Sequence, residues 1–244
     1  MKEILTRMTN HSNKIAIIIT AAGSSTRMGG CKKEYLSLQN ETVLSKNINT
    51  FLSFLEQNKS LVVNSFIITI PKNGLEAAEK AVNPYVNLSN FDFNLDFVEG
   101  GDSRQKSILN ALEYINQKAD KPDYVLIHDG ARPFISEKII KAVTDTITED
   151  VAAAPGVTPV DTIKQLDENG IITSHLQRNR LSAIQTPQGF YFSKLYEAHL
   201  KAKNDDVEYT DDTEIWGKYC GPVKMVCGDV KNIKITYSGD LEKA

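Results

Sequence analysis

Small residues and cations follow the first strongly apolar run of the chain. The stretch from Ala21 to Lys33 contains Gly23 and Arg27 and ends in two consecutive lysines. Small residues let a backbone approach a ligand closely, and successive peptide N–H groups can surround phosphate oxygens. The glycine spacing matches neither the P-loop nor the dinucleotide-binding fingerprint. An ordinary strand-to-helix turn with solvated cations explains the glycines equally well, so the loop alone suggests phosphate binding without establishing it.

A carboxylate stands at the end of a later apolar run. Asp129 belongs to the motif His128-Asp129-Gly130-Ala131-Arg132-Pro133, which follows a strand predicted at residues 123–127. A carboxylate at the carboxyl end of a strand, facing a phosphate loop, suits a hard cation such as Mg²⁺. Asp129 could instead cap the next turn or pair with Arg132. Taken alone, that structural role explains the motif better.

A double glycine precedes a predicted helix in the middle of the chain. The segment reads Gly100-Gly101-Asp102-Ser103-Arg104 and continues to Ser107. Asp102 or Ser103 is a natural N-cap. The glycines also permit a tight turn beside a ligand, which Arg104 and Ser107 could reach, so a capped helix start and a binding role are compatible.

Two motifs near the end of the chain have mainly structural explanations. Thr210-Asp211-Asp212-Thr213 opens a predicted helix and suits capping. Lys234 lies between Ile233 and Ile235 in a predicted strand, so it points to the opposite face from them. It is either a solvated charge on an edge strand, which the sequence alone favours, or a second cation at the site.

The elements that must position these residues alternate between strand and helix. Continuous β-branched runs predict buried parallel strands, and apolar residues three or four apart predict helices. The predicted strands are residues 15–19, 65–70, 95–98, 123–127, 151–154, 223–226 and 233–236, and the predicted helices are residues 43–55, 74–81, 103–116, 136–148, 193–203 and 211–219. Such alternation implies an α/β fold with a mostly parallel twisted sheet, in which ligands bind beyond the carboxyl ends of the strands.

One segment breaks the alternation. Residues 160–165 and 171–176 are strand-like, and the Asn169-Gly170 pair between them favours a hairpin turn. A hairpin here would protrude from the α/β core. Isolated hairpins are marginally stable in water, so we expect this one to pack against something, most simply a partner subunit.

Composition bounds the kind of protein. The chain has 244 residues, 41% of them hydrophobic, which suits one large α/β domain or one domain with a small appendage. Its formal net charge of −3 lacks the basic field expected of a nucleic-acid-binding protein, so a phosphate ligand must be held by a local cluster of cations and N–H groups. The three cysteines, Cys31, Cys220 and Cys227, indicate neither a disulfide framework nor a zinc site.

The start of the chain carries no recognisable targeting signal. Residues 1–13 contain no apolar core of a signal peptide and are expected to form a short flexible leader. The apolar run at residues 15–19 is far too short to span a bilayer. A reducing cytoplasm is the simplest compartment, with no membrane partner.

Taken together and in order, the motifs resemble a known family. The matching elements are Ala21-Ala22-Gly23, Arg27-Met28, Lys33 with Tyr35-Leu36, Gly100 to Arg104, His128 to Pro133, Asp161-Thr162, Gln185 to Gln188 and Asn232 to Thr236. Each is weak alone, but their ordered set resembles the 2-C-methyl-D-erythritol 4-phosphate cytidylyltransferases of the non-mevalonate isoprenoid pathway. The resemblance spans roughly residues 15–241.

This resemblance implies both a reaction and an architecture. The expected reaction joins CTP to 2-C-methyl-D-erythritol 4-phosphate with Mg²⁺, giving the CDP-linked alcohol and pyrophosphate. The expected fold is a Rossmann-like nucleotidyltransferase, with residues 14–244 as a single domain. The hairpin within residues 157–176 would be an interlocking β-arm of a homodimer.

The resemblance also implies roles for individual residues. Arg27 and Lys33 would grip the triphosphate and stabilise charge at the α-phosphorus, and Lys234 would be the second catalytic lysine. The backbone of Ala21, Ala22 and Gly23 would contact the nucleotide, and the cytosine and ribose would be bound by Gly100, Asp102, Arg104 and Ser107. Asp129 would bind the metal. Thr162 and Arg178 would bind the methylerythritol phosphate across the dimer, and Arg132 and Thr186 would lie at or near that acceptor site.

Three positions depart from the family pattern, which commonly has Gly, Pro and Gln where this chain has Ser25, Lys32 and Glu34. Ser25 would adopt a positive φ only under strain. Lys32 adds a cation, and Glu34 could partly neutralise the two lysines before it. These departures concern the geometry of the loop rather than the roles of Arg27 and Lys33.

Other functions remain open on the sequence alone. A ribitol 5-phosphate cytidylyltransferase would share most of the motifs, although Gly130-Ala131 and residues 183–189 favour the methylerythritol enzymes. A non-catalytic nucleotide-binding module would not need a cation on each side of the α-phosphate. An NAD-dependent dehydrogenase would need a glycine spacing that the loop lacks.

Overall fold

The computed structural model describes residues 13–23, 25, 30, 32–237 and 239–242. The expected leader at residues 1–13 therefore lies outside the described residues, except for Asn13, which begins the first strand. Among the described residues, no helix has the length and apolar character needed to cross a bilayer.

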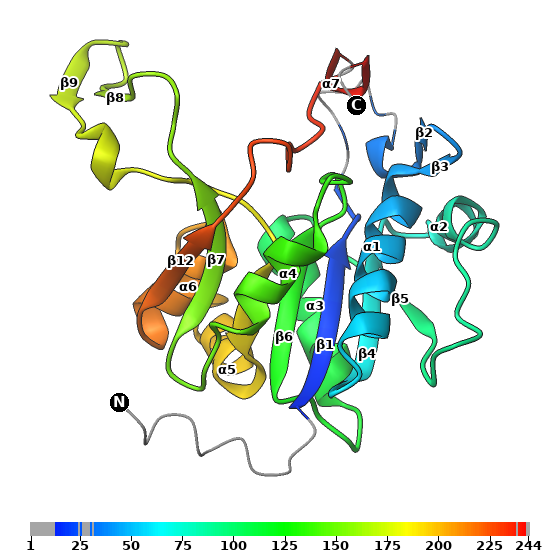
Figure 1. The fold of residues 1–244 in the computed structure, drawn as a ribbon. Coiled ribbons are helices and arrows are strands. Elements are labelled where there is room, and N and C mark those ends of the chain that lie inside the picture. The colour runs from blue at the N-terminus through cyan, green and yellow to red at the C-terminus, as the bar shows by residue number, and fades with distance from the viewer. Residues whose placement is uncertain (1–12, 24, 26–29, 31, 238, 243–244) are drawn as a thin grey trace.

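An eight-stranded sheet forms the centre of the molecule (Figure 1). Its strands are β1 (Asn13–Thr20), β4 (Leu61–Ile70), β5 (Leu95–Glu99), β6 (Tyr124–Asp129), β7 (Ala152–Val157), β10 (Ala183–Ile184), β11 (Gln188–Tyr191) and β12 (Val223–Cys227). The order is β10-β7-β11-β6-β1-β4-β5, with β12 paired to β7. Strands β6, β1, β4 and β5 are parallel, as is the pair β7 and β12. The predicted α/β fold with a mostly parallel sheet is confirmed.

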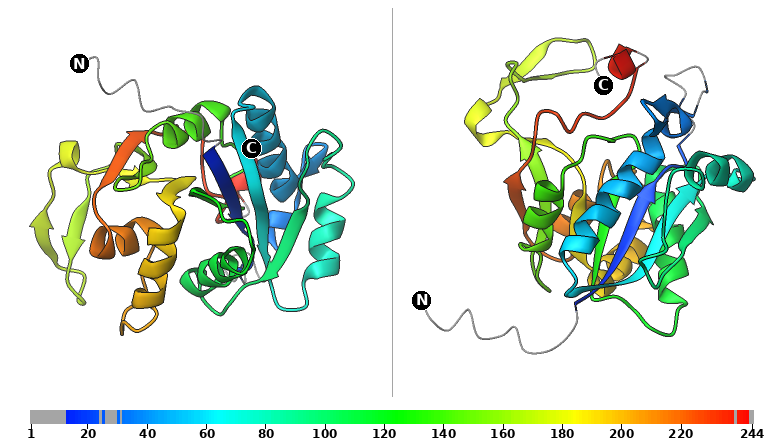
Figure 2. Two further views of the ribbon diagram at one scale, coloured as in Figure 1. Left: turned by 90° about the horizontal axis from the view of Figure 1, so that it is seen from below. Right: turned by 45° about the vertical axis from the view of Figure 1, so that its right-hand side comes forward.

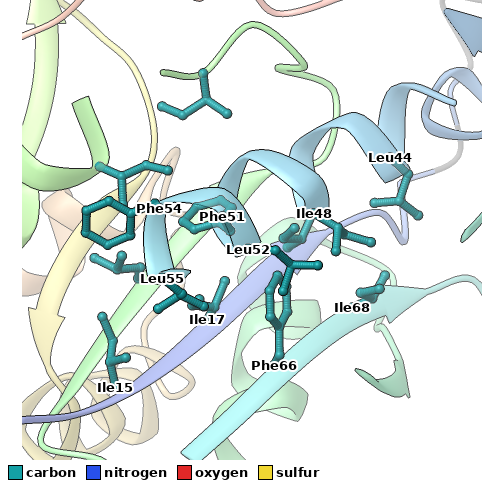
Figure 3. Close-up of a cluster of buried hydrophobic side chains, with 14 of the residues drawn as sticks. Ile15, Ile17, Leu44, Ile48, Phe51, Leu52, Phe54, Leu55, Phe66 and Ile68 are labelled. Atoms are coloured by element: carbon teal, nitrogen blue, oxygen red, sulfur yellow. The ribbon is translucent and has the colours of Figure 1, made fainter. Parts of the chain in front are cut away.

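Helices cover both faces of this sheet (Figure 2). The helices are α1 (Val43–Gln57), α2 (Leu75–Val82), α3 (Arg104–Asn116), α4 (Glu137–Thr144), α5 (Phe192–Ala202), α6 (Asp212–Tyr219) and α7 (Gly239–Glu242). Side chains alternate across β1. Ile15, Ile17 and Ile19 pack with the cluster that contains residues of α1 and α4 (Figure 3), whereas Ala16 and Ile18 pack with residues of α3, α5 and α6.

The β-branched run therefore forms a strand that is buried on both faces. Ile15, Ile17, Ile18 and Ile19 are each at most 1% exposed. Burying an aliphatic side chain contributes about 1.5–3 kcal/mol relative to leaving it in water. This core holds the carboxyl ends of β1 and β6 side by side, since Thr20 pairs with Asp129 in the sheet.

Short elements complete the frame around the end of β1. A 3₁₀ helix, η3 (Lys33–Tyr35), is followed by the hairpin of β2 (Ser37–Leu38) and β3 (Glu41–Thr42). Thr42 and Ser45 then form a capping box at the start of α1. The loop after β1 is thus held between a central strand and a capped helix.

The predicted hairpin is present and protrudes from the sheet (Figure 1). Strands β8 (Lys164–Leu166) and β9 (Ile172–His175) form a separate two-stranded sheet, shorter than predicted. Gly170 has φ +80°, as the Asn-Gly signal requires, and the Asp167 carboxylate accepts hydrogen bonds from the N–H groups of Asn169 and Ile171. Apolar side chains remain exposed on this arm, with Val160 81% and Ile171 63% exposed.

The prediction of a strand at residues 233–236 is wrong, because residues 232–236 have no regular secondary structure. The backbone of this segment is held by isolated contacts rather than by strand pairing: the Ile235 N–H donates to the carbonyl of Ala131 at 2.8 Å, and the Asn232 carbonyl accepts from Arg132 Nη1 at 2.9 Å. The helix predicted to reach Thr148 ends at Thr144. The Thr148 hydroxyl there accepts hydrogen bonds from the N–H groups of Asp150 and Val151, which forms the turn into β7.

One central strand was not predicted. Strand β11 lies antiparallel between β6 and β7. Gly189 fits this place because a Cβ there would lie 2.7 Å from Val143 and 2.8 Å from Ile147. Since β11 is only four residues long, it has too few residues to show a recognisable pattern of hydrophobic side chains.

Candidate functional site

A cavity of about 520 Å³ opens at the carboxyl ends of β1 and β6. A volume of this size is typical of small-molecule sites. Its wall comes from the loop after β1, the segment before α3, the end of β6 and the Asn232–Thr236 segment. The residues that line it are Thr20, Ala22, Gly23, Ser25, Lys33, Glu34, Thr69, Gly101, Asp102, Ser103, Arg104, Ser107, Asp129, Ala131, Glu208, Lys234 and Thr236.

Most of the expected nucleotide-binding residues line this cavity. Ala22, Gly23, Lys33, Asp102, Arg104, Ser107, Asp129 and Lys234 all belong to its wall. Arg27 lies outside the described residues. Ala21 and Gly100 lie behind the wall, while Glu34 and Glu208 line it without having been predicted. Glu34 was singled out in the sequence only as a departure that could neutralise the lysines before it, and Glu208 had no signal, since it stands in a polar stretch that reads as solvated surface.

Asp129 is the electrostatic centre of the site. Among the described residues, its carboxylate lies 2.8 Å from Lys234 Nζ, 3.4 Å from Arg132 Nε and 3.5 Å from Arg104 Nε. Burial by itself raises the pKa of Asp129, but these cations, Lys234 foremost, hold that pKa well below its usual range. The carboxylate is therefore ionised; it pairs with Arg132, as the structural alternative expected, and it also lines the cavity.

Arg104 is held between two carboxylates. Its guanidinium Nη1 donates to Asp212 at 2.8 Å, while Nε faces Asp129. Burial opposes the charged form, but Asp212 and Asp129 raise the pKa of Arg104 further above its already high value. Asp212 is 1% exposed and also lies 3.0 Å from His199 Nε2. Helix α6 is capped by Asp211, so the neighbouring Asp212 is available to orient Arg104.

A buried polar network supports Asp129 from behind. The Thr186 hydroxyl accepts a hydrogen bond from the Asp129 N–H at 3.0 Å and lies 3.0 Å from His128 Nδ1. His128 Nε2 lies 2.9 Å from the amide oxygen of Asn47. Thr186 is 3% exposed and Arg132 lies beside Asp129, so the structure places both next to the carboxylate without exposing them to the cavity.

Glycine is required where two walls of the cavity meet. A Cβ at Gly100 would lie 2.3 Å from the Cβ of Ala22 and 2.6 Å from the hydroxyl of Ser107. Ser107 in turn accepts a hydrogen bond from the Gly101 N–H at 3.1 Å. The double glycine therefore lets the loop after β1 touch the start of α3.

The loop after β1 contains an unusual backbone conformation. Ser25 has φ +51°, which is uncommon for a residue with a side chain, and its buried hydroxyl has no hydrogen-bond partner among the described residues. The sequence allowed Ser25, which stands where the family commonly has Gly, to adopt a positive φ only under strain, and the structure has this positive φ. Nearby, Lys33 Nζ donates to the carbonyl of Ile235 at 2.8 Å, which ties η3 to the segment that carries Lys234.

Thr162 and Arg178 do not reach this cavity within one chain. Arg178 donates to the Thr162 hydroxyl at 3.3 Å, and both residues lie in the region of the protruding arm. The cavity lining contains neither of them. If they act on a ligand in this cavity, a second copy of the chain must bring them there.

Cations and carboxylates both line the cavity. Lys33, Arg104 and Lys234 bring positive charge to its wall, the backbone of Ala22 and Gly23 adds peptide groups, and the acidic residues of the wall are Glu34, Asp102, Asp129 and Glu208. Within the described residues, no group of three or more His, Cys, Asp or Glu side chains could enclose a metal ion. A metal here would thus share its coordination between Asp129 and oxygens of the ligand, as magnesium–nucleotide sites do.

Comparison with known proteins agrees with this arrangement. A family model described as 2-C-methyl-D-erythritol 4-phosphate cytidylyltransferase matches residues 15–244. A relative of that name from Clostridium beijerinckii is 38% identical over 93% of this chain and 95% of its own length. One from Bacillus cereus is 36% identical over 92% and 93% of the two chains.

Solved structures show the same likeness. The 4-diphosphocytidyl-2C-methyl-D-erythritol synthase of Anaerococcus prevotii superposes with a TM-score of 0.77 at 26% identity, over 96% of this chain and 97% of that one. The 2-C-methyl-D-erythritol 4-phosphate cytidylyltransferase of Thermus thermophilus gives a TM-score of 0.68 at 26% identity, over 94% and 96%. The chain therefore belongs to the 2-C-methyl-D-erythritol 4-phosphate cytidylyltransferase family.

Proposed function

We propose that this chain transfers CMP from CTP to 2-C-methyl-D-erythritol 4-phosphate, giving 4-diphosphocytidyl-2-C-methyl-D-erythritol and pyrophosphate. The observation that carries the proposal is the arrangement of Lys234 and Arg104 around Asp129, in a cavity whose opposite wall is the loop after β1. The names of the family and of its relatives supply the substrates and favour methylerythritol phosphate over ribitol phosphate as the acceptor.

The reaction follows from position and charge. A phosphate oxygen of the acceptor attacks the α-phosphorus of CTP in line, the new P–O bond forms, and the bond to pyrophosphate breaks. The attacking oxygen is already anionic, so no general base is required. Arg27, Lys33 and Lys234 would stabilise the negative charge that develops on the transferring group, and a single such donor typically contributes about 10²–10³ in kcat.

The nucleotide is assigned to the side of the cavity nearest α3. Ala22 and Gly23, with Ala21 behind them, would present backbone to the nucleotide. Gly100, Asp102, Arg104 and Ser107 would form the cytosine and ribose pocket. The fixed orientation of Arg104 between Asp129 and Asp212 supports this assignment, because an anchored guanidinium can recognise a ligand without losing conformational freedom.

Mg²⁺ fits the donors that are present. Asp129 is an ionised carboxylate that reaches the cavity, and magnesium sites in nucleotide enzymes commonly use one or two carboxylates together with substrate phosphates. Bound there, Mg²⁺ would neutralise charge on the triphosphate. Asp129 would hold it, and Lys234, which contacts the same carboxylate in this structure, would turn towards the phosphates instead.

A homodimer would complete the acceptor site. The arm carries Thr162 and Arg178 together with exposed apolar residues, which suits insertion against a second copy. The partner's arm would then supply the residues that grip the methylerythritol phosphate, next to Arg132 and Thr186. Residues 14–244 would act as one domain with this arm, in the cytoplasm, without nucleic-acid or membrane partners.

A substrate panel tests the proposal. Pyrophosphate release is measured with CTP or UTP and with methylerythritol 4-phosphate or ribitol 5-phosphate, and the product is identified by phosphorus NMR. We expect efficient turnover only for CTP with methylerythritol 4-phosphate, and only with a divalent cation. Turnover restricted to ribitol 5-phosphate, or nucleotide binding without pyrophosphate release for either acceptor, would reject it.

A further inference from the structure

The side chain of Lys32 is tied back onto the loop that precedes it. Its ammonium donates to the carbonyl of Ala21 at 2.5 Å and to that of Gly23 at 2.6 Å. The same ammonium lies 5.6 Å from the centre of the Tyr35 ring. One side chain thus connects the end of β1 with the 3₁₀ helix that follows the loop.

Lys32 does not face the space where a ligand would bind. The cavity wall contains the next two residues of the chain, Lys33 and Glu34, but it does not contain Lys32. The Lys32 side chain is 18% exposed, and its hydrogen bonds go to backbone carbonyls. Its contacts are those of a residue that shapes the loop rather than one that binds phosphate.

Glu34 supplies the matching negative charge. Its carboxylate lies 3.6 Å from the Lys32 ammonium, its side chain is 5% exposed, and its Oε2 has no hydrogen-bond partner among the described residues. Leaving an ionised carboxylate buried without a cation is strongly unfavourable. Burial, the larger effect, lowers the pKa of Lys32, and the neighbouring Glu34 carboxylate partly offsets this by raising it.

The clamp also fixes the orientation of the loop's peptide planes. In a trans peptide, the carbonyl and the next N–H point in opposite directions. The Ala21 carbonyl points at the ammonium, so the N–H of Ala22 faces away from it. Ala22 lines the cavity. Peptide N–H groups held in one direction form the kind of concavity that binds phosphate oxygens.

We propose that Lys32 and Glu34 form a charged clamp that holds the loop after β1 ready for the CTP triphosphate, with Lys32 as a positioning residue. The inference rests on the proposed function for its substrate. It explains two of the departures from the family pattern together, because the cation and the carboxylate depend on each other.

Substitutions can separate this role from direct phosphate binding. Lys32 has φ −66°, a value that proline also adopts. K32P removes the ammonium but keeps the backbone, and leaves Glu34 as a buried unpaired anion. E34Q then removes that anion. The clamp therefore predicts that K32P is impaired and that the double variant K32P/E34Q recovers, whereas a lost phosphate ligand cannot be restored by changing Glu34.

The test compares wild type, K32M, K32P, E34Q and K32P/E34Q, with K141M/D145N as a control that removes an exposed lysine–carboxylate pair. We expect K32M and K32P to raise KM for CTP about tenfold, the size of effect of leaving a buried polar group such as Glu34 without its charged partner. KM for the acceptor should stay unchanged. The double variant should return to within about threefold of wild type. A double variant as impaired as K32P would overturn the clamp.

Hydrogen exchange in the ligand-free protein gives a second measurement that needs no substrate. The clamp predicts faster exchange in K32M of the Ala21 amide, which donates to the Thr69 carbonyl at 3.1 Å at the end of the loop that Lys32 holds. Unchanged exchange in K32M would overturn it. If exchange behaves as expected but no variant, wild type included, turns over methylerythritol 4-phosphate, then the proposed function fails and the clamp stands.

Discussion

The Lys234 ammonium lies 2.8 Å from the Asp129 carboxylate, although only Asp129 belongs to a regular element. Lys234 sits in a segment that Ile235 anchors to Ala131, just after β6, and that Asn232 anchors to the turn before β11, where its side-chain amide donates to the Thr186 carbonyl at 3.0 Å. The pair is thus formed by tertiary contacts. In the proposed reaction, a magnesium-bound triphosphate gives both groups new partners, so the ion pair describes the ligand-free state of the site.

Removing the Lys234 charge should impair the chemical step. K234M is expected to lower kcat by at least about 10²-fold with a smaller change in KM for CTP, because the charge acts mainly on the transition state. Lys33→Ala should lose at least as much. Steady-state kinetics with both substrates saturating measures this. The exposed neighbour Lys231 is the control, and near-wild-type kcat in K234M would reject a catalytic role.

Asp129 should determine the requirement for a divalent cation. D129N keeps the shape of the side chain but weakens metal ligation and leaves the surrounding cations without their counter-charge. We expect the Mg²⁺ concentration for half-maximal rate to rise about tenfold or more, since a carboxylate is a principal magnesium ligand in such sites. A magnesium titration of the rate checks this, with D145N on the surface as control. An unchanged magnesium requirement would show that Asp129 only pairs with cations.

Arg178 should act on the acceptor and in the partner's site. R178A is expected to raise KM for the sugar phosphate and to leave KM for CTP intact; equal loss of CTP affinity would contradict the assignment. Mixing R178A with K234M gives a sharper test at low acceptor concentration. If the arm completes the neighbouring site, random exchange of subunits restores one intact site in each mixed dimer, or about a quarter of wild-type activity.

That experiment also has a clear negative result. If Arg178 served its own subunit, each site of the mixed dimer would carry one defect and activity would not recover. A mixture that shows no recovery, although mass spectrometry detects mixed dimers, therefore rejects the exchanged arm. Failure to form any dimer rejects it as well.

His128 should make the fold sensitive to acid. Burial lowers the pKa of His128 to about 4. Its Nδ1 lies against the Thr186 hydroxyl and its Nε2 against Asn47, so a second ring proton would disturb the contact with Thr186. The unfolded chain takes up that proton near pH 6.5, so the free energy of unfolding falls between about pH 6.5 and pH 4, by about 3 kcal/mol in total.

Urea unfolding at a series of pH values, in buffer that contains a metal chelator, measures this change in the free energy of unfolding. The substitution H175N, on the exposed arm, should leave the pH dependence intact. NMR of the ring nitrogens supplies an independent check, and His128 should remain neutral at pH 5.5. A His128 ring that is already protonated at that pH would refute the expectation.

Much of the site could be predicted because it follows strand ends. Thr20 and Asp129 terminate neighbouring parallel strands, and the continuous apolar runs of these strands indicate burial on both faces. The position of Asp129 beside the loop after β1 is therefore already implied by the chain order. The same reasoning predicted the arm, because the Asn169-Gly170 turn requires the positive φ that Gly170 adopts.

The rest depends on contacts that have no spacing in the sequence. Asp212 reads as a helix cap, but Asp211 caps the helix and Asp212 turns inwards to Arg104. The sequence places Glu34 next to two lysines that it could neutralise, but only the fold reveals that its side chain is buried and lies beside Lys32. Residues 233–236 have β-branched character but find no neighbouring strand to pair with, so local preference did not decide their structure.

The bond from Lys33 to the Ile235 carbonyl has a consequence for biosynthesis. A chain made from its N-terminus carries the loop after β1 and Asp129 well before the ribosome has added the segment with Ile235 and Lys234. Until that segment is made, Lys33 lacks the Ile235 carbonyl that accepts its hydrogen bond here, and Asp129 lacks one of its counter-charges. The candidate site is therefore complete only after the segment with Ile235 and Lys234 has been synthesised and has packed beside Lys33 and Asp129.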